Sequence, residues 1–142
     1  MSPLGESAVH VSLESHPFPV FFRRGLNVTL TTDNPLHIHM TQEPLLEEYA
    51  TASQMWKLSP TDLCEIARNS ILQSGFTPKE KEEWIGPSHG VFDISGHDIT
   101  KTNVPAIRLR FRLDSYLDEF SFVYQKDDSD FCFDSPCFEE SS

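Results

Sequence analysis

Residues 26–39 read LNVTLTTDNPLHIH, and this stretch decides which fold the sequence predicts. Apolar and polar residues alternate from 26 to 32, several of them β-branched, which predicts a short strand. Proline cannot donate to a strand ladder, so Asn34-Pro35 is expected to end the strand and leave Asp33 at its tip. Barrel enzymes of the α/β class carry catalytic groups at such tips. Asp-Asn-Pro is also a good turn, and the local sequence alone favours the turn.

Three long blocks of the sequence resemble one enzyme family. Residues 31–59, TTDNPLHIHMTQEPLLEEYATASQMWKLS, are similar to the STDDPLQ.H.TKEPL.EEY..A..VWKLS block of AMP deaminases, which belong to the zinc-dependent adenosine deaminase superfamily. LCEIARNSILQSGF, residues 63–76, continues the match. GHDITKTNVPAIRLRFR, residues 96–112, resembles the family's G.DI..TNVP.IR.

Two upstream blocks extend the resemblance to the whole of residues 1–124. HPFPVFFRRGLNV, residues 16–28, resembles NPFP.FF.RGLNV, and MSPL, residues 1–4, resembles the start of the family's MSPLSNNS. The resemblance implies an α/β fold, namely the last strand or two of a (β/α)8 barrel with its C-terminal helices. A complete barrel needs about 250 residues. The 142 residues therefore predict an incomplete barrel and a piece of a longer enzyme.

The resemblance also assigns functional residues. Hydrolytic deamination of adenine requires an activated water, a metal that lowers the pKa of that water, and an acid that protonates the ring. The superfamily holds one zinc ion with three histidines and one aspartate, and Asp33 occupies the place of that aspartate, which also orients the zinc-bound water. Asn34, Pro35, Leu36 and His37 take the places of the substrate-lining D-P-L-Q. Two of these four residues, Asn34 and His37, depart from the family.

Most of the family's active site has no counterpart in this sequence. The paired zinc histidines lie on the first barrel strand, and the third zinc histidine, the acid glutamate and the histidine beside the water come from middle strands. None of the six histidines here matches them. His37 and His39 resemble the first-strand pair only in their letters, since they follow the last strand. We therefore expect the isolated chain to be inactive.

The amino-acid composition argues against several classes of binding partner. A net charge of −11 argues against nucleic acid and against an anionic membrane surface. No apolar run approaches a membrane span, no signal peptide opens the chain, and three cysteines at no metal-like spacing suit a reducing compartment. A cytosolic protein is expected. Much of the charge lies in residues 125–142, an acidic, serine-rich stretch that predicts a disordered tail after a folded part over residues 1–124.

Helices are predicted on both sides of the strand. A short helix is expected in the second half of residues 17–24, with core phenylalanines at 18, 21 and 22. Residues 43–58 form a second helix, with Glu47 and Glu48 placed off its apolar face, which consists of Leu45, Tyr49, Ala52 and Trp56. A third helix is expected from a capping Ser59 to Gly75. A capping box at Thr77 and Glu80 opens a fourth that reaches about Trp84.

Residues 107–112 alternate apolar side chains with Arg108, Arg110 and Arg112. This predicts a strand or extended segment with one basic face, followed by a short helix over residues 113–124. Three arginines suggest phosphate binding. They match no phosphate motif of the family, however, and solvated or interface arginines are commoner.

Three functions remain open. The first is an AMP deaminase, typically a homotetramer with AMP as substrate, of which this chain forms the C-terminal third of the barrel. The second is a non-catalytic remnant or interaction protein that docks on an intact deaminase subunit. The third is a small metal-binding domain that uses Asp33, His37 and His39.

Overall fold

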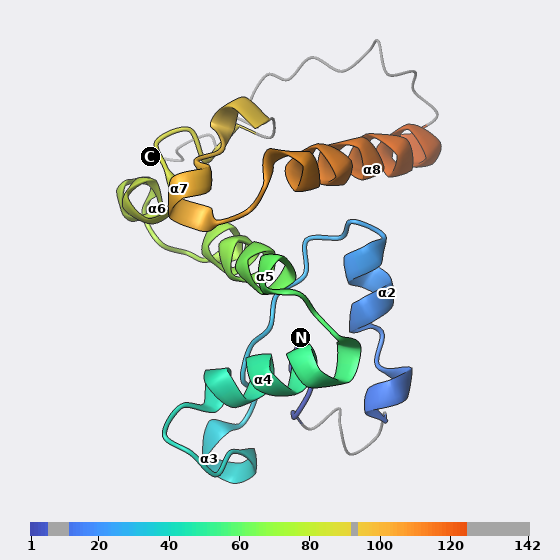
Figure 1. The fold of residues 1–142 in the computed structure, drawn as a ribbon, viewed down its shortest axis with the longest axis vertical. Coiled ribbons are helices and arrows are strands. Elements are labelled where there is room, and N and C mark those ends of the chain that lie inside the picture. Colours follow the sequence, from blue (N-terminus) through green and yellow to red (C-terminus); the bar gives the residue numbers. More distant parts are fainter. Residues whose placement is uncertain (6–11, 92–93, 125–142) are drawn as a thin grey trace, which may run out of the picture.

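The computed structural model describes residues 1–5, 12–91 and 94–124 (Figure 1). In these ranges the chain forms α-helices and two 3-10 turns, and it contains no strand. The predicted tail over residues 125–142 lies outside the described residues. In chain order the elements are η1 (Leu13–Ser15), α2 (Phe18–Arg23), α3 (Pro35–Ile38), α4 (Pro44–Trp56), α5 (Pro60–Gln73), α6 (Pro78–Ile85), η2 (Ile94–Gly96), α7 (Ile99–Thr102) and α8 (Ala106–Tyr124).

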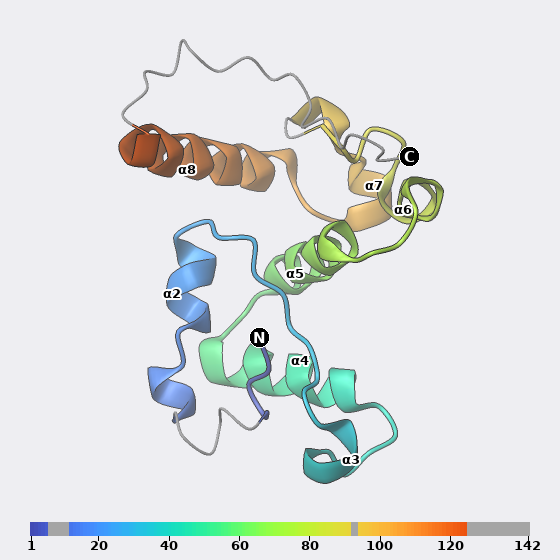
Figure 2. The ribbon, with the colours of Figure 1, turned by 180° about the vertical axis from the view of Figure 1, so that it is seen from behind.

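The predicted strand over residues 26–32 is not formed, and the described residues are all-helical rather than α/β. The segment is extended and runs past α4 and α5 in both ribbon views (Figures 1 and 2). Its main chain pairs with that of Met1, whose nitrogen donates to Thr29 O at 2.7 Å and whose carbonyl accepts from Thr31 N at 3.0 Å. These two bonds bracket Leu30 as in a parallel ladder. One residue of pairing is too little to make a sheet.

Side chains of α5 bind the same segment. Asn69 Nδ2 donates to Val28 O at 3.3 Å and Gln73 Nε2 donates to Asn27 O at 2.5 Å. Asn69 is buried. Because buried main-chain carbonyls need donors, these two amides replace part of the ladder that the segment lacks.

The apolar core lies around the extended segment and is small. It consists of Phe18, Phe22, Leu30, Ala52 and Ile66, with Trp56 and Tyr49 partly buried against it. The Phe18 and Trp56 rings stack with centroids 4.7 Å apart. Two expectations are corrected here, because Phe21 and Leu45 are 37% and 48% exposed.

The local signals for the middle helices are confirmed. Ser59 and Asp62 form a capping box at α5, and Thr77 and Glu80 form one at α6, so each pair satisfies two amide groups that the first turn leaves unbonded. Lys57 ends α4 in the left-handed conformation at φ 54°. Caps of this kind depend only on neighbouring residues, which is why the sequence predicts them.

The predicted extended segment at 107–112 is wrong, because these residues lie in α8. The alternation misleads because Arg108 and Arg112, four residues apart, share one face of a helix just as they share one face of a strand. Arg110 lies off that face and pairs with Asp114 at 3.3 Å, both side chains being more than half exposed. Within the described ranges, no helix combines the length and hydropathy of a membrane span.

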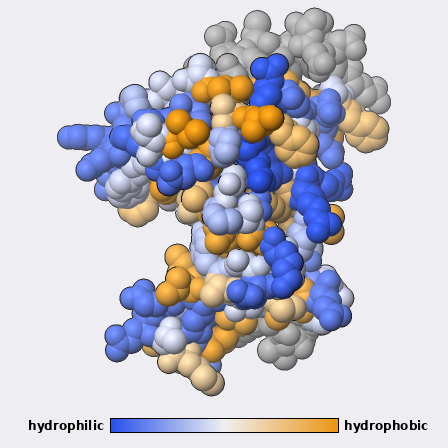
Figure 3. Space-filling model, viewed as in Figure 1, coloured by the Kyte–Doolittle hydropathy of each residue, from blue (hydrophilic) through white to orange (hydrophobic). Residues whose placement is uncertain are grey.

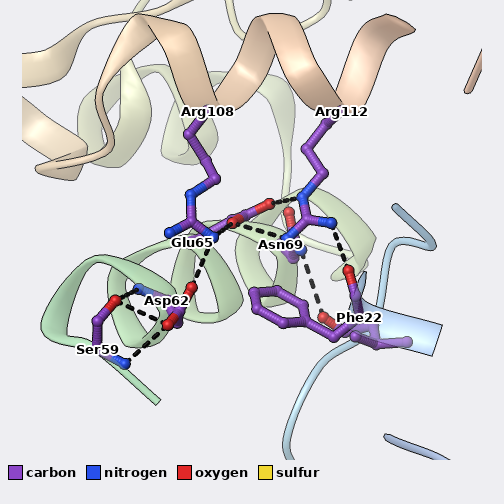
Figure 4. A network of polar contacts seen from close by, with 8 residues as sticks. Phe22, Ser59, Asp62, Glu65, Asn69, Arg108 and Arg112 are labelled. Atoms are coloured by element: carbon purple, nitrogen blue, oxygen red, sulfur yellow. Dashed lines mark hydrogen bonds and ion pairs between the residues drawn. The ribbon is translucent and has the colours of Figure 1, made fainter. Parts of the chain in front are cut away.

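Ion pairs join α8 to the rest of the molecule (Figure 4). Arg112 Nε lies 2.5 Å from Glu65 Oε1, and its Nη2 lies 3.2 Å from Glu65 Oε2. The same guanidinium donates to Phe22 O and lies over the Phe22 ring at 4.4 Å. Arg108 Nη1 contacts Asp62 Oδ1 at 2.6 Å. Arg108 and Arg112 therefore lie at the interface between α8 and α5. This agrees with the expectation that arginines are commoner at interfaces than as phosphate ligands.

We predict that Arg112→Ala lowers the free energy of unfolding by about 3 kcal/mol, because the Glu65 carboxylate, which is 2% exposed, loses its bidentate partner and keeps the longer contact to Arg108 Nη1 at 3.4 Å. Arg110→Ala on the same helix is the matched control. It removes an exposed pair and should cost less than about 0.5 kcal/mol. Urea denaturation followed by circular dichroism measures both, and equal losses would contradict this account of α8.

Acid should weaken the same contact through Asp62. Burial on its own raises the pKa of Asp62, but hydrogen bonds from Ser59 and the Arg108 guanidinium bring it below the ordinary value. A depressed folded pKa contributes stability above the unfolded pKa of about 4, and that contribution is lost as the pH falls through the folded pKa. Asp62→Asn should therefore show a smaller drop in urea midpoint between pH 5 and pH 3 than the parent chain. Asp114→Asn, at an exposed site, should keep the parent's drop.

Candidate functional site

Asp33 lies at the end of the extended segment, directly before α3, and is exposed. The turn at the start of the chain packs behind it, where Gly5 N donates to Ser2 O at 3.2 Å. A Cβ atom on Gly5 would lie 3.0 Å from Asp33 Cβ and 2.8 Å from Ser2 Oγ. Even a methyl group would force one of these neighbours to move. The back of Asp33 is therefore closely packed.

The residues after Asp33 do not continue in an extended conformation. Asn34 is the N-cap of α3, Pro35 is its first residue, and His37 N donates to Asn34 O at 3.0 Å. Proline is favoured at the first helical position, because its missing N–H has no partner there in any case. Pro35 thus starts a helical turn here as well as ending the extended segment. Leu36 is 94% exposed, and His37 is exposed.

The expected trio Asp33, His37 and His39 is not brought together. The helical turn removes the alternation that would place them on one face. His39 instead turns inward, with its side chain 0% exposed. Among the described residues, no three His, Cys, Asp or Glu side chains are grouped so that they could hold a metal ion.

The zinc ion that the resemblance implies does not fit the described residues by themselves. A catalytic zinc needs three protein ligands and one open position. Asp33 offers one carboxylate, and its exposure shows that nothing in the described ranges closes over it. A complete zinc site therefore requires ligands from another part of a protein.

His39 lies between two adjacent glutamates of α4. Its Nδ1 is 3.1 Å from Glu47 Oε2, and its Nε2 is 3.3 Å from Glu48 Oε1, without hydrogen-bond geometry in the second case. Thr41 donates to Glu47 through its hydroxyl and through its amide, the latter at 2.8 Å. The Thr41 hydroxyl bond, followed by the bond from His39, holds the pKa of Glu47 below its ordinary value against the opposing effect of burial.

The predicted position of Glu48, off the buried face of α4, is wrong. Glu48 is 0% exposed. Ser2 Oγ donates to its Oε1 at 2.6 Å, and Leu4 N donates to its Oε2 at 3.0 Å. A signal was present, because Glu48 is three residues after Leu45 and four before Ala52, on the same helical face. Its charge, rather than its position, led to the wrong expectation.

A shallow surface hollow between α2 and α8 is remote from these residues. It is lined by Arg23, Arg24, Ser115, Asp118, Glu119 and Phe122. Arg24 and Glu119 pair across it at 2.8 Å, and both are more than half exposed. Mixed charge and an internal ion pair favour no ligand, so the candidate site remains the surroundings of Asp33.

Comparisons with known proteins identify one family. The family model described as AMP deaminase matches residues 1–129. The chain is 53% identical over 124 residues to "AMP deaminase" of Arabidopsis thaliana and 47% identical over 123 residues to "AMP deaminase" of Saccharomyces cerevisiae, covering 87% of this chain and 15% of each relative. "AMP deaminase 3" of Homo sapiens is 46% identical over 123 residues, with 87% of this chain and 16% of the relative covered. The chain thus spans about a sixth of the length of these relatives.

Proposed function

This chain belongs to the AMP deaminase family, and from that premise we propose that it is the part of a zinc-dependent AMP deaminase that supplies the carboxylate of Asp33. The reaction is the hydrolytic deamination of AMP to IMP and ammonia. The observation that carries the proposal is the position of Asp33 within a long family match. It follows an extended segment, faces outward and is packed from behind. The remaining active-site groups come from outside this chain.

The pairing at Leu30 supports an incomplete barrel over residues 1–124. Bonds from Met1 to Thr29 and from Thr31 to Met1 are those of adjacent parallel strands, the arrangement that a (β/α)8 barrel uses throughout. We assign Met1 to the end of one barrel strand and residues 26–32 to the next. Without further neighbours, these strands remain extended segments.

Substrate contacts are proposed for the residues that follow Asp33. Asn34, Pro35, Leu36 and His37 form the first turn of α3 and its cap, and three of them are exposed. The N7 atom of a purine is an acceptor, so its partner must donate a hydrogen bond. The Asn34 amide can donate without being protonated first. A family enzyme with asparagine at this place is therefore expected to keep its activity.

Exposed apolar side chains support burial against other protein. Leu36 and Met40 are 94% and 99% exposed, and Ile107 and Phe122 are 81% and 83% exposed. The space-filling view shows such side chains on both halves of the molecule (Figure 3). Extended apolar surface of this kind marks interfaces. We propose that the rest of a cytosolic deaminase, assembled as a homotetramer, covers these faces.

The same surfaces leave a second candidate function, a non-catalytic chain that docks on an intact deaminase subunit. Both candidates bury Leu36 and Ile107. They differ in whether Asp33 enters a working active site. Coding sequence upstream that carries a first strand with the His-x-His pair would favour the first candidate.

A chimera tests the first candidate. Residues 1–124 replace the aligned region of the yeast AMP deaminase, and the purified chimera is expected to release ammonia from AMP. Asp33→Ala in the chimera should lower kcat by about 10²-fold or more, because a group at the reacting centre is lost, and should lower the zinc content. Zinc is measured by elemental analysis and ammonia by a coupled assay.

Asp114→Ala in the same chimera is the control, since Asp114 is exposed and pairs with Arg110 on the same helix. It should leave kcat unchanged. A folded, zinc-loaded tetramer without turnover, or full turnover after Asp33→Ala, would count against the assignment of Asp33.

The isolated 142-residue chain should neither hold stoichiometric zinc nor deaminate AMP. Its described residues offer no grouped ligands to complete a site with Asp33. Elemental analysis after dialysis, and ammonia release with and without added zinc, measure this. Turnover that disappears in Asp33→Ala would overturn the prediction and show that a minimal site assembles between copies.

A further inference from the structure

We propose that Glu48 is the positioning residue for Asp33, acting through the Ser2–Leu4 turn on one side and through His39 on the other. The proposal rests on the proposed function only for the chemical role of Asp33. The structural part stands on contacts within this chain. Glu48 does not touch Asp33 or a substrate position, so its effect is indirect.

Glu48 is held by hydrogen bonds from the turn at the start of the chain. Its carboxylate is wholly buried, and it accepts from Ser2 Oγ at 2.6 Å and from Leu4 N at 3.0 Å. A buried carboxylate is costly unless hydrogen bonds and an opposite charge offset its desolvation. Both donors are neutral. The ring of His39 lies beside the carboxylate, with Nε2 at 3.3 Å from Oε1.

The turn that begins at Ser2 packs against Asp33 through Gly5. The position that a Cβ on Gly5 would take is 2.8 Å from Ser2 Oγ and 3.0 Å from Asp33 Cβ. Gly5 therefore lies between Ser2 and Asp33 with no room for a side chain. The same turn is tied to the extended segment by Met1, through Thr29 and Thr31. A shift of Ser2 away from Glu48 must displace the packing behind Asp33.

His39 is connected to Asp33 through α3. In this helix Ile38 N donates to Asn34 O at 3.2 Å and His39 N donates to Pro35 O at 3.3 Å. These bonds make residues 34–39 one short, stiff unit. Because the His39 ring is enclosed by Glu47 and Glu48, the far end of that unit is fixed. Asp33 is thus held at both of its flanks by contacts that meet at Glu48.

Several groups surround Glu48. His39 lies between it and Glu47, with Nδ1 3.1 Å from Glu47 Oε2 and Nε2 3.3 Å from Glu48 Oε1. Glu48 also acts on the Met1 ammonium group and on His16: it raises the pKa of both, against the larger lowering by burial. Glu48 thus influences several groups around it, and its contact with His39 is the one that leads back to Asp33.

The experiment compares the full 142-residue chain with Glu48→Gln, which keeps the shape and removes the charge, and with Glu43→Gln, an exposed control at the cap of α4. Nitrogen-15 NMR of the histidine rings at pH 7 should show the His39 ring resonances shifted in Glu48→Gln, because the carboxylate beside Nε2 is lost, and unchanged in Glu43→Gln.

Amide exchange measures the positioning. In Glu48→Gln, exchange at Leu4, Thr31 and the turn after Asp33 should accelerate about 10-fold or more, while amides of α5 keep the parent's rates. Ser2→Ala, which removes one donor, should accelerate the same amides by a smaller factor, and it serves if Glu48→Gln fails to fold. Unchanged exchange near Asp33 in the folded variants, or unchanged His39 resonances in Glu48→Gln, overturns the proposal.

The yeast chimera separates this proposal from the proposed function. Glu48→Gln in an active chimera should lower kcat with little change in KM and with the zinc content kept. A chimera that is inactive with every residue in place sinks the proposed function and leaves the exchange result standing. An active chimera unaffected by Glu48→Gln sinks the positioning role.

Discussion

The contact between Arg112 and Glu65 is the interaction on which the arrangement of the helices depends. It joins α8 to α5, and the same guanidinium reaches the carbonyl and the ring of Phe22 on α2. No residue of α8 is buried, so apolar burial does little to hold this long helix in place. A bidentate arginine provides direction as well as energy. The helix is therefore oriented by a polar contact.

The apolar core lies elsewhere, around the extended segment. Phe18, Trp56 and Ile66 enclose Leu30, so the segment is fixed through the side chain that points inward. Its outward-facing side is left open, and Asp33 lies at the end of that side. Asp33 is therefore exposed, while the core on the other side of the segment is small.

What the sequence predicted correctly was local. Caps at Ser59 and Thr77 involve neighbours three residues apart, and both are present. What it predicted wrongly was non-local or ambiguous in period: residues 26–32 needed strands to pair with, and residues 107–112 fit two periodicities. The same holds for the candidate site. Asp33 is a candidate because of a long sequence resemblance, whereas the burial of Glu48 depends on a contact with Ser2, which is 46 residues away.

The chain aligns with about a sixth of the length of each relative. The groups that support Asp33 lie inside this chain: the turn at Ser2, the carboxylate of Glu48 and the ring of His39 contact one another without help from elsewhere. Catalytic groups need such support to be held within a fraction of an ångström. The contacts proposed to position Asp33 are thus made by the same chain that carries its carboxylate.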